Sequence, residues 1–184
     1  MASARAVLVP PDKLLAHIRP HRRILAACVR GGSIGFALSD PYFSHATPLL
    51  LRRPLAANWW ASLVREHSVG AVAFALPASL AGADAEAALA ERAELLRGLV
   101  QPEGNGTAPP GSVYTLLPEK RLSDARALAR EQPELWEDVA PFLHSAQAAE
   151  TGALSSAACA AHAAIGLNHF FWVECEGWAR NTFG

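Results

Sequence analysis

Apolar positions in the first half of the chain predict short strands separated by turns. Two apolar runs, residues 24–29 and 34–38, flank a glycine-containing turn and predict an antiparallel pair. A third strand is expected at 45–51, where Pro48 indicates a sheet edge or a strand start. The continuous apolar run at 71–76 is typical of a strand buried on both faces.

Helical periodicity dominates the rest of the chain. Residues 56–67 predict one helix, and residues 83–100 place Leu89, Ala93 and Leu96 on a single stripe. A fifth strand is expected at 113–117. Further helical patterns cover 123–130, 133–147 and an Ala-rich segment at 154–171.

This order predicts an α/β fold with a mixed five-stranded sheet, in which a three-strand antiparallel meander is followed by two βα units. Helices are expected on both faces of the sheet. The domain is expected to span 23–170 with a surface loop at 101–112. A basic arm, 1–22, precedes it and an aromatic tail, 171–184, follows it.

Composition narrows the class of protein. The 184 residues can bury a proper core without metals or disulfides, and no apolar run reaches the length of about 18 residues that a membrane helix needs. We therefore expect no membrane insertion and no cofactor. Three cysteines at unpaired spacing favour a reducing compartment over secretion. The net charge of −1 lacks the strong positive balance of an unaided nucleic-acid binder.

The first thirty residues are nevertheless basic. Their only acidic residue is Asp12. Such a start resembles an organelle transit segment and suggests an organelle matrix, a mitochondrion ahead of a chloroplast, with the cytoplasm as the other location. The alternative is a basic arm that lies on a partner or on the domain itself. The positively charged residues of this segment are Arg5, Lys13, Arg19, Arg22, Arg23 and Arg30.

Two motifs suggest a hydrolase or a metal site, but the residues around them favour other interpretations. Gly31, Ser33 and Gly35 form the G-x-S-x-G pattern of a hydrolase nucleophile elbow, but the residues that follow predict a strand instead of the helix that an elbow requires. A hairpin turn is the better interpretation. A metal site built from Cys159, His162 and His169 is conceivable on the last helix, but no second ligand pair accompanies them. We expect a buried cysteine and a helix histidine there, and no bound metal.

Aromatic residues suggest a surface for a partner. Trp60 is expected in the core, so that Trp59 faces outward. The aromatic residues at the chain end either anchor in a partner protein or pack back on the domain. The candidate partner-binding residues are Trp59, Phe171, Trp172, Trp178 and Phe183.

Several segments in order resemble the YqgF family of Holliday junction resolvases and pre-ribosomal-RNA nucleases. These segments are ILAACVRGGSIGFALSD, ATPLL, LVREHSVGAVAFALPASLAGADAEAA, VYTLLPEKRLSDARALA and SSAACAAHAAI. The family's I-G-V-A-V-S-D segment matches residues 34–40, its G-L-P with a following Gly matches Leu76, Pro77 and Gly82, and the end of its D-E-R-L-T motif matches 121–123. The resemblance spans residues 23–168 and implies an RNase H-like fold.

The resemblance also implies metal-dependent nuclease chemistry, which needs three carboxylates to hold two magnesium ions. Matched residue by residue, the first-strand Asp falls on Cys28, the metal-binding Glu on Lys120, and the helix Asp on Ser155 or Ser156. The ligands are therefore expected to be lost. Sliding the motif by one residue would place Glu119 at the metal position, and Asp40 and Asp124 are the other nearby acidic residues.

Three functions follow as hypotheses. The favoured one is a catalytically inactive RNase H-like subunit of a larger assembly, such as an organellar ribosome or another ribonucleoprotein, with protein partners and possible RNA contact. The second is an active nuclease of the YqgF type whose acidic residues have relocated, acting on structured RNA or DNA. The third is a nucleic-acid-binding module in which Arg30, Lys120 and Arg121 bind phosphate in the former active-site cleft.

Overall fold

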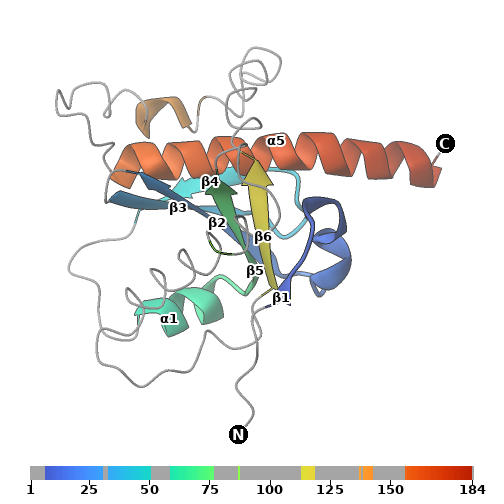
Figure 1. Ribbon diagram of the computed structural model, residues 1–184, viewed down its shortest axis with the longest axis horizontal. Helices are drawn as coiled ribbons and strands as arrows, with labels where there is room; N and C mark the ends of the chain where they lie inside the picture. Colours follow the sequence, from blue (N-terminus) through green and yellow to red (C-terminus); the bar gives the residue numbers. More distant parts are fainter. Residues whose placement is uncertain are drawn as a thin grey trace, which may run out of the picture.

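The computed structural model has a mixed α/β fold (Figure 1). It describes residues 7–30, 33–50, 59–76, 113–118 and 156–183, together with residues 87, 137 and 139–142. The helices predicted at 83–100 and 123–130 and the loop at 101–112 lie outside this part of the chain, apart from residue 87, which is helical. Of the predicted helix at 133–147, residues 137 and 139–142 are described and helical.

The described strands form one sheet in the order β1-β6-β5-β2-β3-β4. Strands β2, β3 and β4 make an antiparallel meander, while β5 pairs parallel to β2, β6 parallel to β5 and β1 parallel to β6. Their bounds are β1 Val7–Leu8, β2 Arg23–Arg30, β3 Ser33–Ser39, β4 Ala46–Leu49, β5 Val69–Leu76 and β6 Val113–Pro118.

The sheet has one strand more than the predicted five, because the short strand β1 pairs with β6. The patterning missed it because a two-residue strand has no periodicity to detect. The third strand is also shorter than predicted, since it ends at Leu49 and leaves Leu50 exposed. Pro48 does lie on an edge strand, β4, where its missing N–H costs little.

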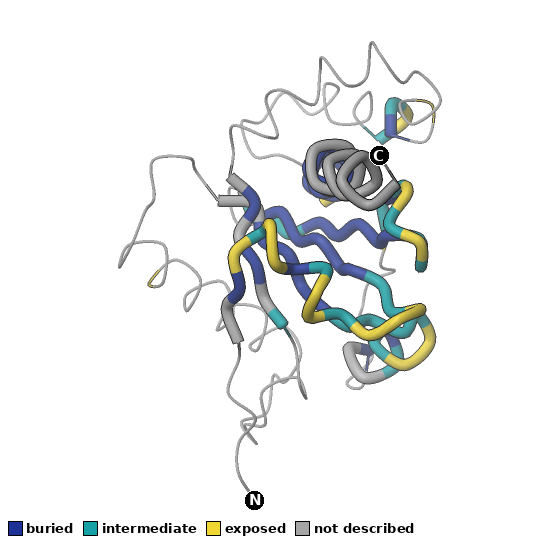
Figure 2. Tube along the Cα trace, turned by 90° about the vertical axis from the view of Figure 1, so that its right-hand side faces the viewer, coloured by how far each residue is buried: buried dark blue, intermediate teal, exposed yellow. Residues whose placement is uncertain are grey.

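Side chains of different size cover the two faces of the sheet. Along β2, residues Ile24, Ala26 and Cys28 face the long helix α5 (Ser156–Phe183), and the alternate residues Leu25 and Ala27 face helix α1 (Trp59–Glu66), as the two-residue strand period requires. The α5 face is rich in alanine, whereas the α1 face has larger side chains. The larger side chains are Leu25, Phe36, Leu38, Trp59, Leu63, Val72 and Phe74. Figure 2 shows the buried strands between the two layers.

Asn168 of α5 protects the outer edge of β4. Its side-chain amide accepts a hydrogen bond from the Ala46 N–H at 2.6 Å and donates one to the Ala46 carbonyl at 2.9 Å, and the residue is buried. The amide thus takes the place of a neighbouring strand at this position. Edge strands with unpaired backbone groups invite pairing with other chains, and this contact removes one such opening.

The part of the expected basic arm that the structure describes, residues 7–22, packs on the domain, and residues 1–6 lie outside the described residues. Val9 and Leu14 are buried in the same cluster as α5. Thr115 of β6 donates a buried hydrogen bond to the Val9 carbonyl at 2.9 Å. Two short 3-10 helices, η1 (Pro11–Lys13) and η2 (Leu15–His17), then lead to β2.

Helix α5 extends to Phe183, so the predicted helix end at Phe171 is wrong and the expected tail continues the helix. No proline occurs after Phe171, and the single glycine between Phe171 and Phe183, Gly177, is too weak a helix breaker to end the helix. Despite this length, none of the helices in the described part of the chain is both long and apolar enough to span a membrane.

Replacing Asn168 by Ala should lower the free energy of unfolding by about 2 kcal/mol, because it leaves the N–H and carbonyl of Ala46 without partners in a buried place. Urea denaturation of the variant and the parent chain measures this difference. Tyr42→Phe, at a largely exposed position, serves as the control and should change the midpoint little. Equal midpoints for Asn168→Ala and the parent would show that water replaces the amide there.

Candidate functional site

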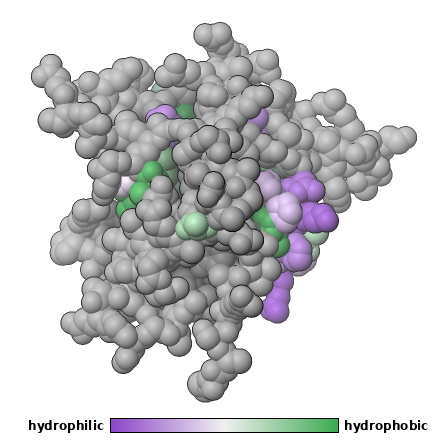
Figure 3. Space-filling view, in the orientation of Figure 1, coloured by the Kyte–Doolittle hydropathy of each residue, from purple (hydrophilic) through white to green (hydrophobic). Residues whose placement is uncertain are grey.

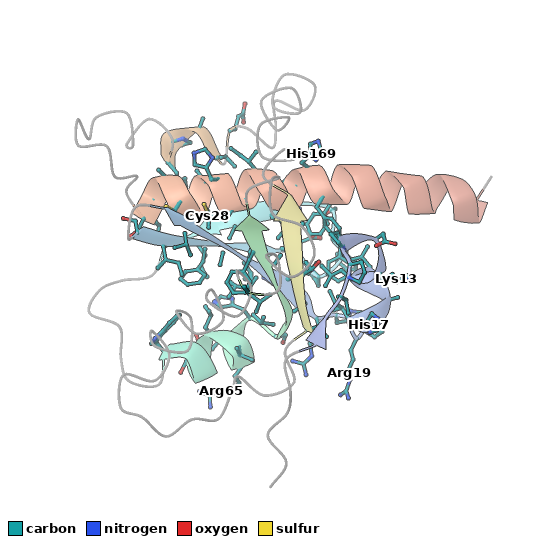
Figure 4. All side chains as sticks on the ribbon, in the orientation of Figure 1. Lys13, His17, Arg19, Cys28, Arg65 and His169 are labelled. Carbon is teal, nitrogen blue, oxygen red and sulfur yellow. The ribbon has the colours of Figure 1, made fainter. Side chains whose placement is uncertain are left out.

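The candidate site lies where β2 ends, below the first turns of α5. Cys28 is 2% exposed and belongs to the apolar cluster between the sheet and this helix. It pairs with Gly35 across the β2–β3 ladder. Figure 4 shows Cys28 beneath α5. The position that the resemblance assigns to a magnesium-binding Asp is therefore a thiol within the core.

The G-x-S-x-G pattern belongs to a hairpin. Arg30 pairs with Ser33, so Gly31 and Gly32 connect the two strands, although their own conformation lies outside the described residues. Ser33 begins a strand and no helix follows it, which excludes the strand-to-helix turn of a nucleophile elbow. The hairpin interpretation is confirmed.

Gly35 brings helix α5 into backbone contact with the sheet. A Cβ atom at this position would collide with the backbone nitrogen of Ala160 and the carbonyl oxygen of Ser156, and would lie 2.5 Å from the carbonyl carbon of Cys159. Cys159 is fully buried, and its thiol donates a long hydrogen bond of 3.8 Å to the Ser33 carbonyl. The sequence contained a signal for this contact, since a glycine inside a strand often marks close backbone approach.

The described residues at this end do not fit a magnesium ion. Magnesium prefers hard oxygen ligands, and a buried neutral thiol is a poor one. Ser156, one of the two matches to the family's helix Asp, is exposed at the start of α5. No group of three or more His, Cys, Asp or Glu side chains in the described ranges is placed to hold a metal ion.

Several predicted site residues cannot be compared with the geometry. Glu119, Lys120, Arg121, Asp124 and Ser155 lie outside the described residues. Arg30 is described through its backbone, as the last residue of β2. The structure therefore brings together Cys28, Ser33, Gly35 and the start of α5 at this end of the sheet.

Asp40 lies at the opposite end of β3. The seven residues from Ser33 correspond to about 20 Å of strand, so this carboxylate cannot reach the Cys28 end. Its oxygens accept hydrogen bonds from the N–H groups of Tyr42, Ser44 and His45 at 3.2, 2.7 and 3.1 Å. The Ser44 hydroxyl donates to the same carboxylate at 3.0 Å. Asp40 thus organises the turn between β3 and β4.

These hydrogen bonds determine the ionisation of Asp40. Burial alone would raise its pKa, but the hydrogen bonds from His45, from the Ser44 backbone and hydroxyl, and from Tyr42 outweigh burial and hold the pKa of Asp40 below its ordinary value. The Ser44 hydroxyl also lies 3.1 Å from Nδ1 of His45. Because the carboxylate bonds mainly to the backbone of its own turn, we interpret this serine, histidine and aspartate as a turn cap and not as a catalytic triad.

Two candidate partner-binding aromatic residues are core residues. Trp59 was expected to face outward, but it is 9% exposed and its ring centroid lies 6.0 Å from that of Phe36. The helix begins at Trp59, which places it on the same buried face as Leu63, four residues later. Phe171 is also buried, against Phe43 and Phe170.

Trp60, Trp172, Trp178 and Phe183 are helical, but their side chains lie outside the description. Their roles in the core or at a partner surface stay predictions. His162 is partly buried and His169 is buried on α5, where Figure 4 shows His169 on the side of the helix away from the sheet.

Comparison with known proteins adds no relative to this picture. No family model matches the chain, and no curated protein matches it.

Replacing Gly35 by Ala should destabilise the domain by about 3 kcal/mol or more, because the added methyl group meets helix backbone that cannot rotate away. Thermal and urea unfolding of the variant measure the loss. Ser33→Ala, on the same strand and at a partly exposed position, is the matched control and should change stability by less than about 1 kcal/mol. A Gly35→Ala variant as stable as the parent would contradict the close packing of α5 on β3.

Asp40→Asn should make stability less sensitive to acid. Because the pKa of Asp40 is lowered in the folded chain, its contribution is fully present above the ordinary Asp pKa of about 3.9 and is lost as the pH falls through the lowered value. Urea midpoints measured from pH 7 down to pH 2 should fall more steeply for the parent than for the variant. Parallel profiles for the two proteins would contradict the assignment.

Proposed function

We propose that this chain is a non-catalytic RNase H-like subunit of a larger assembly, such as an organellar ribosome or another ribonucleoprotein. It would be a degenerate member of the YqgF family that uses the fold for binding and support. Its partners would be protein subunits, with RNA as a further component of the assembly.

The sheet arrangement supports the RNase H-like part of the proposal. The antiparallel meander of β2, β3 and β4 beside the parallel strands β5 and β6 is the arrangement that the resemblance implies. The last helix, α5, packs on the meander near the end of β2. This is the region in which the family's first-strand and last-helix carboxylates would have to meet.

Cys28 is the observation that supports loss of catalysis most strongly. A carboxylate at its position would be buried among alanines and against helix backbone, where an ion needs compensating charge. The thiol needs none, and its small volume lets α5 approach. The chain therefore has an apolar contact where phosphodiester cleavage would need an open, charged cleft.

The proposed location is an organelle matrix, a mitochondrion ahead of a chloroplast. The arginine-rich, acid-poor start of the sequence favours it, but Val9 and Leu14 are buried in the folded domain, so a removable transit segment would have to precede them. A fluorescent fusion of the full chain expressed in its own source tests this location separately from the proposed function.

The purified chain should not cleave structured RNA or a four-way DNA junction in 10 mM Mg²⁺ or Mn²⁺, at about a hundredfold molar excess of protein, because a buried thiol cannot hold these ions. In extracts of its source, the protein should sediment in a particle much larger than 19.5 kDa. Identifying the co-sedimenting proteins and RNA names the assembly.

Metal-dependent cleavage that Glu119→Ala abolishes would overturn the proposal in favour of an active nuclease with relocated acidic residues. Sedimentation of the native protein as a free monomer would overturn the subunit role. Salt-sensitive RNA binding that Arg30→Ala with Lys120→Ala abolishes would favour the binding module in the former active-site cleft.

A further inference from the structure

Lysine, arginine and histidine side chains gather at the end of the sheet opposite Cys28. We call this group of residues the basic end. Lys13, His17, Arg19 and His21 are exposed. The basic end comprises Lys13, His17, Arg19, His21, Arg22 and Arg23. In Figure 4, Lys13, His17 and Arg19 lie beside β1 and η2, away from Cys28, and Figure 3 shows hydrophilic residues gathered on this side.

Within residues 11–23 the charge of the basic end is mostly positive, while the carboxylate of Asp40, at the same end of the sheet, is held by hydrogen bonds of its own turn. Residues 11–23 contain a lysine and three arginines, but Asp12 is their only acidic residue. The whole chain has a net charge of −1, so its charges are unevenly distributed. A local concentration of charges of one sign produces an electrostatic field that attracts ligands of the opposite charge, even when the whole protein is nearly neutral.

The backbone of the basic end is fixed in place. Leu14 is completely buried, and Ile18 packs against the same core cluster. The N–H of Arg22 donates to the Arg19 carbonyl at 3.2 Å, and the N–H of Arg23 donates to the Ser68 carbonyl at 3.1 Å. The basic end thus presents charged groups from an ordered segment, which lowers the entropy lost on binding.

The adjoining turns have unusual backbone conformations. His21 and Ser68 have φ angles of 60° and 53°, which non-glycine residues rarely adopt. A Cβ atom added at Gly70 would lie 2.7 Å from the Arg22 Cβ atom, so the start of β5 lies directly against the basic end. Backbone hydrogen bonds and packing stabilise both turns. The arginines of the basic end lie along the turn at residues 19–23, which leads into β2.

The chemistry of the basic end fits a chain of phosphates. Protein interfaces are anchored by buried aromatic side chains together with arginine, and membrane surfaces need apolar side chains that insert. Within the described residues, the large exposed hydrophobic side chains are Tyr42 and Leu50, and neither belongs to the basic end. Arginine and lysine without such anchors are typical of contacts to a nucleic-acid backbone.

We propose that the basic end binds the phosphodiester backbone of a nucleic acid without reading its sequence. The surface differs from the Arg30, Lys120 and Arg121 cleft, since it lies at the start of β2 and not at its end. It does not rest on the proposed subunit role, although it would explain how such a subunit contacts nucleic acid.

The test measures binding of the full chain to a labelled 20-base-pair duplex, as RNA and as DNA, by fluorescence anisotropy between 50 and 200 mM salt. Affinity should fall as the salt concentration rises. Binding releases cations that are condensed on the duplex, and added salt opposes this release. Lys13→Ala with Arg19→Ala should weaken binding about tenfold or more and reduce the slope of log affinity against log salt by about two, one for each phosphate contact.

Arg65→Ala is the matched control, since this exposed arginine lies on α1, apart from the basic end in Figure 4. It should change affinity less than twofold. Circular dichroism and melting curves should be the same for all variants. Binding of both duplexes supports backbone recognition in general, and binding of one identifies the nucleic acid.

The proposal is overturned if the parent does not bind either duplex, if the double variant binds as the parent does, or if Arg65→Ala weakens binding equally. Stronger binding to polyglutamate or to anionic vesicles than to either duplex would also overturn it. None of these results bears on cleavage or on particle size, so the proposed function stands or falls separately.

Discussion

The contact between α5 and Gly35 is the constraint on which the rest of the structure depends. Helix backbone touches strand backbone there, because a residue without Cβ faces a helix turn that contains Cys159 and Ala160. The surrounding alanines of β2, β3 and β5 and of α5 extend this close packing along the helix. The short separation brings Asn168 to the edge of β4 and Phe171 to Phe43, so the register of α5 determines both contacts.

The same contact explains the chemistry of the Cys28 end. Close packing excludes water, and a dry interior favours small neutral side chains over ions. Cys28 and Cys159 meet that requirement, whereas a carboxylate pair would need metal ions between them. Close docking of α5 thus makes this end of β2 and β3 part of the apolar core.

Among the residues that the structure describes, polar contacts gather at the other end of the sheet. Asp40 organises the β3–β4 turn, Ser39 accepts a buried hydrogen bond from the Ile24 N–H at 2.9 Å, and the basic end precedes β2. The paired and largely buried strands β2 and β3 run between the Cys28 end of the sheet and this polar end. Within the described residues, the structure therefore separates the apolar packing around Cys28 from the polar turn of Asp40 and the cations that precede β2.

The amino-acid sequence predicts the strands of the meander, the buried strand β5 and the Ala-rich helix, because alternation and composition are local properties. It also predicts the hairpin at Ser33, since a strand pattern follows it. The packing of distant segments explains why β1 joins the sheet, why Trp59 and Phe171 are buried, and why Asn168 protects β4. Those outcomes depend on contacts between segments that are distant in the sequence, separated by more than a hundred residues for Asn168 and Ala46, and no local pattern records such a contact.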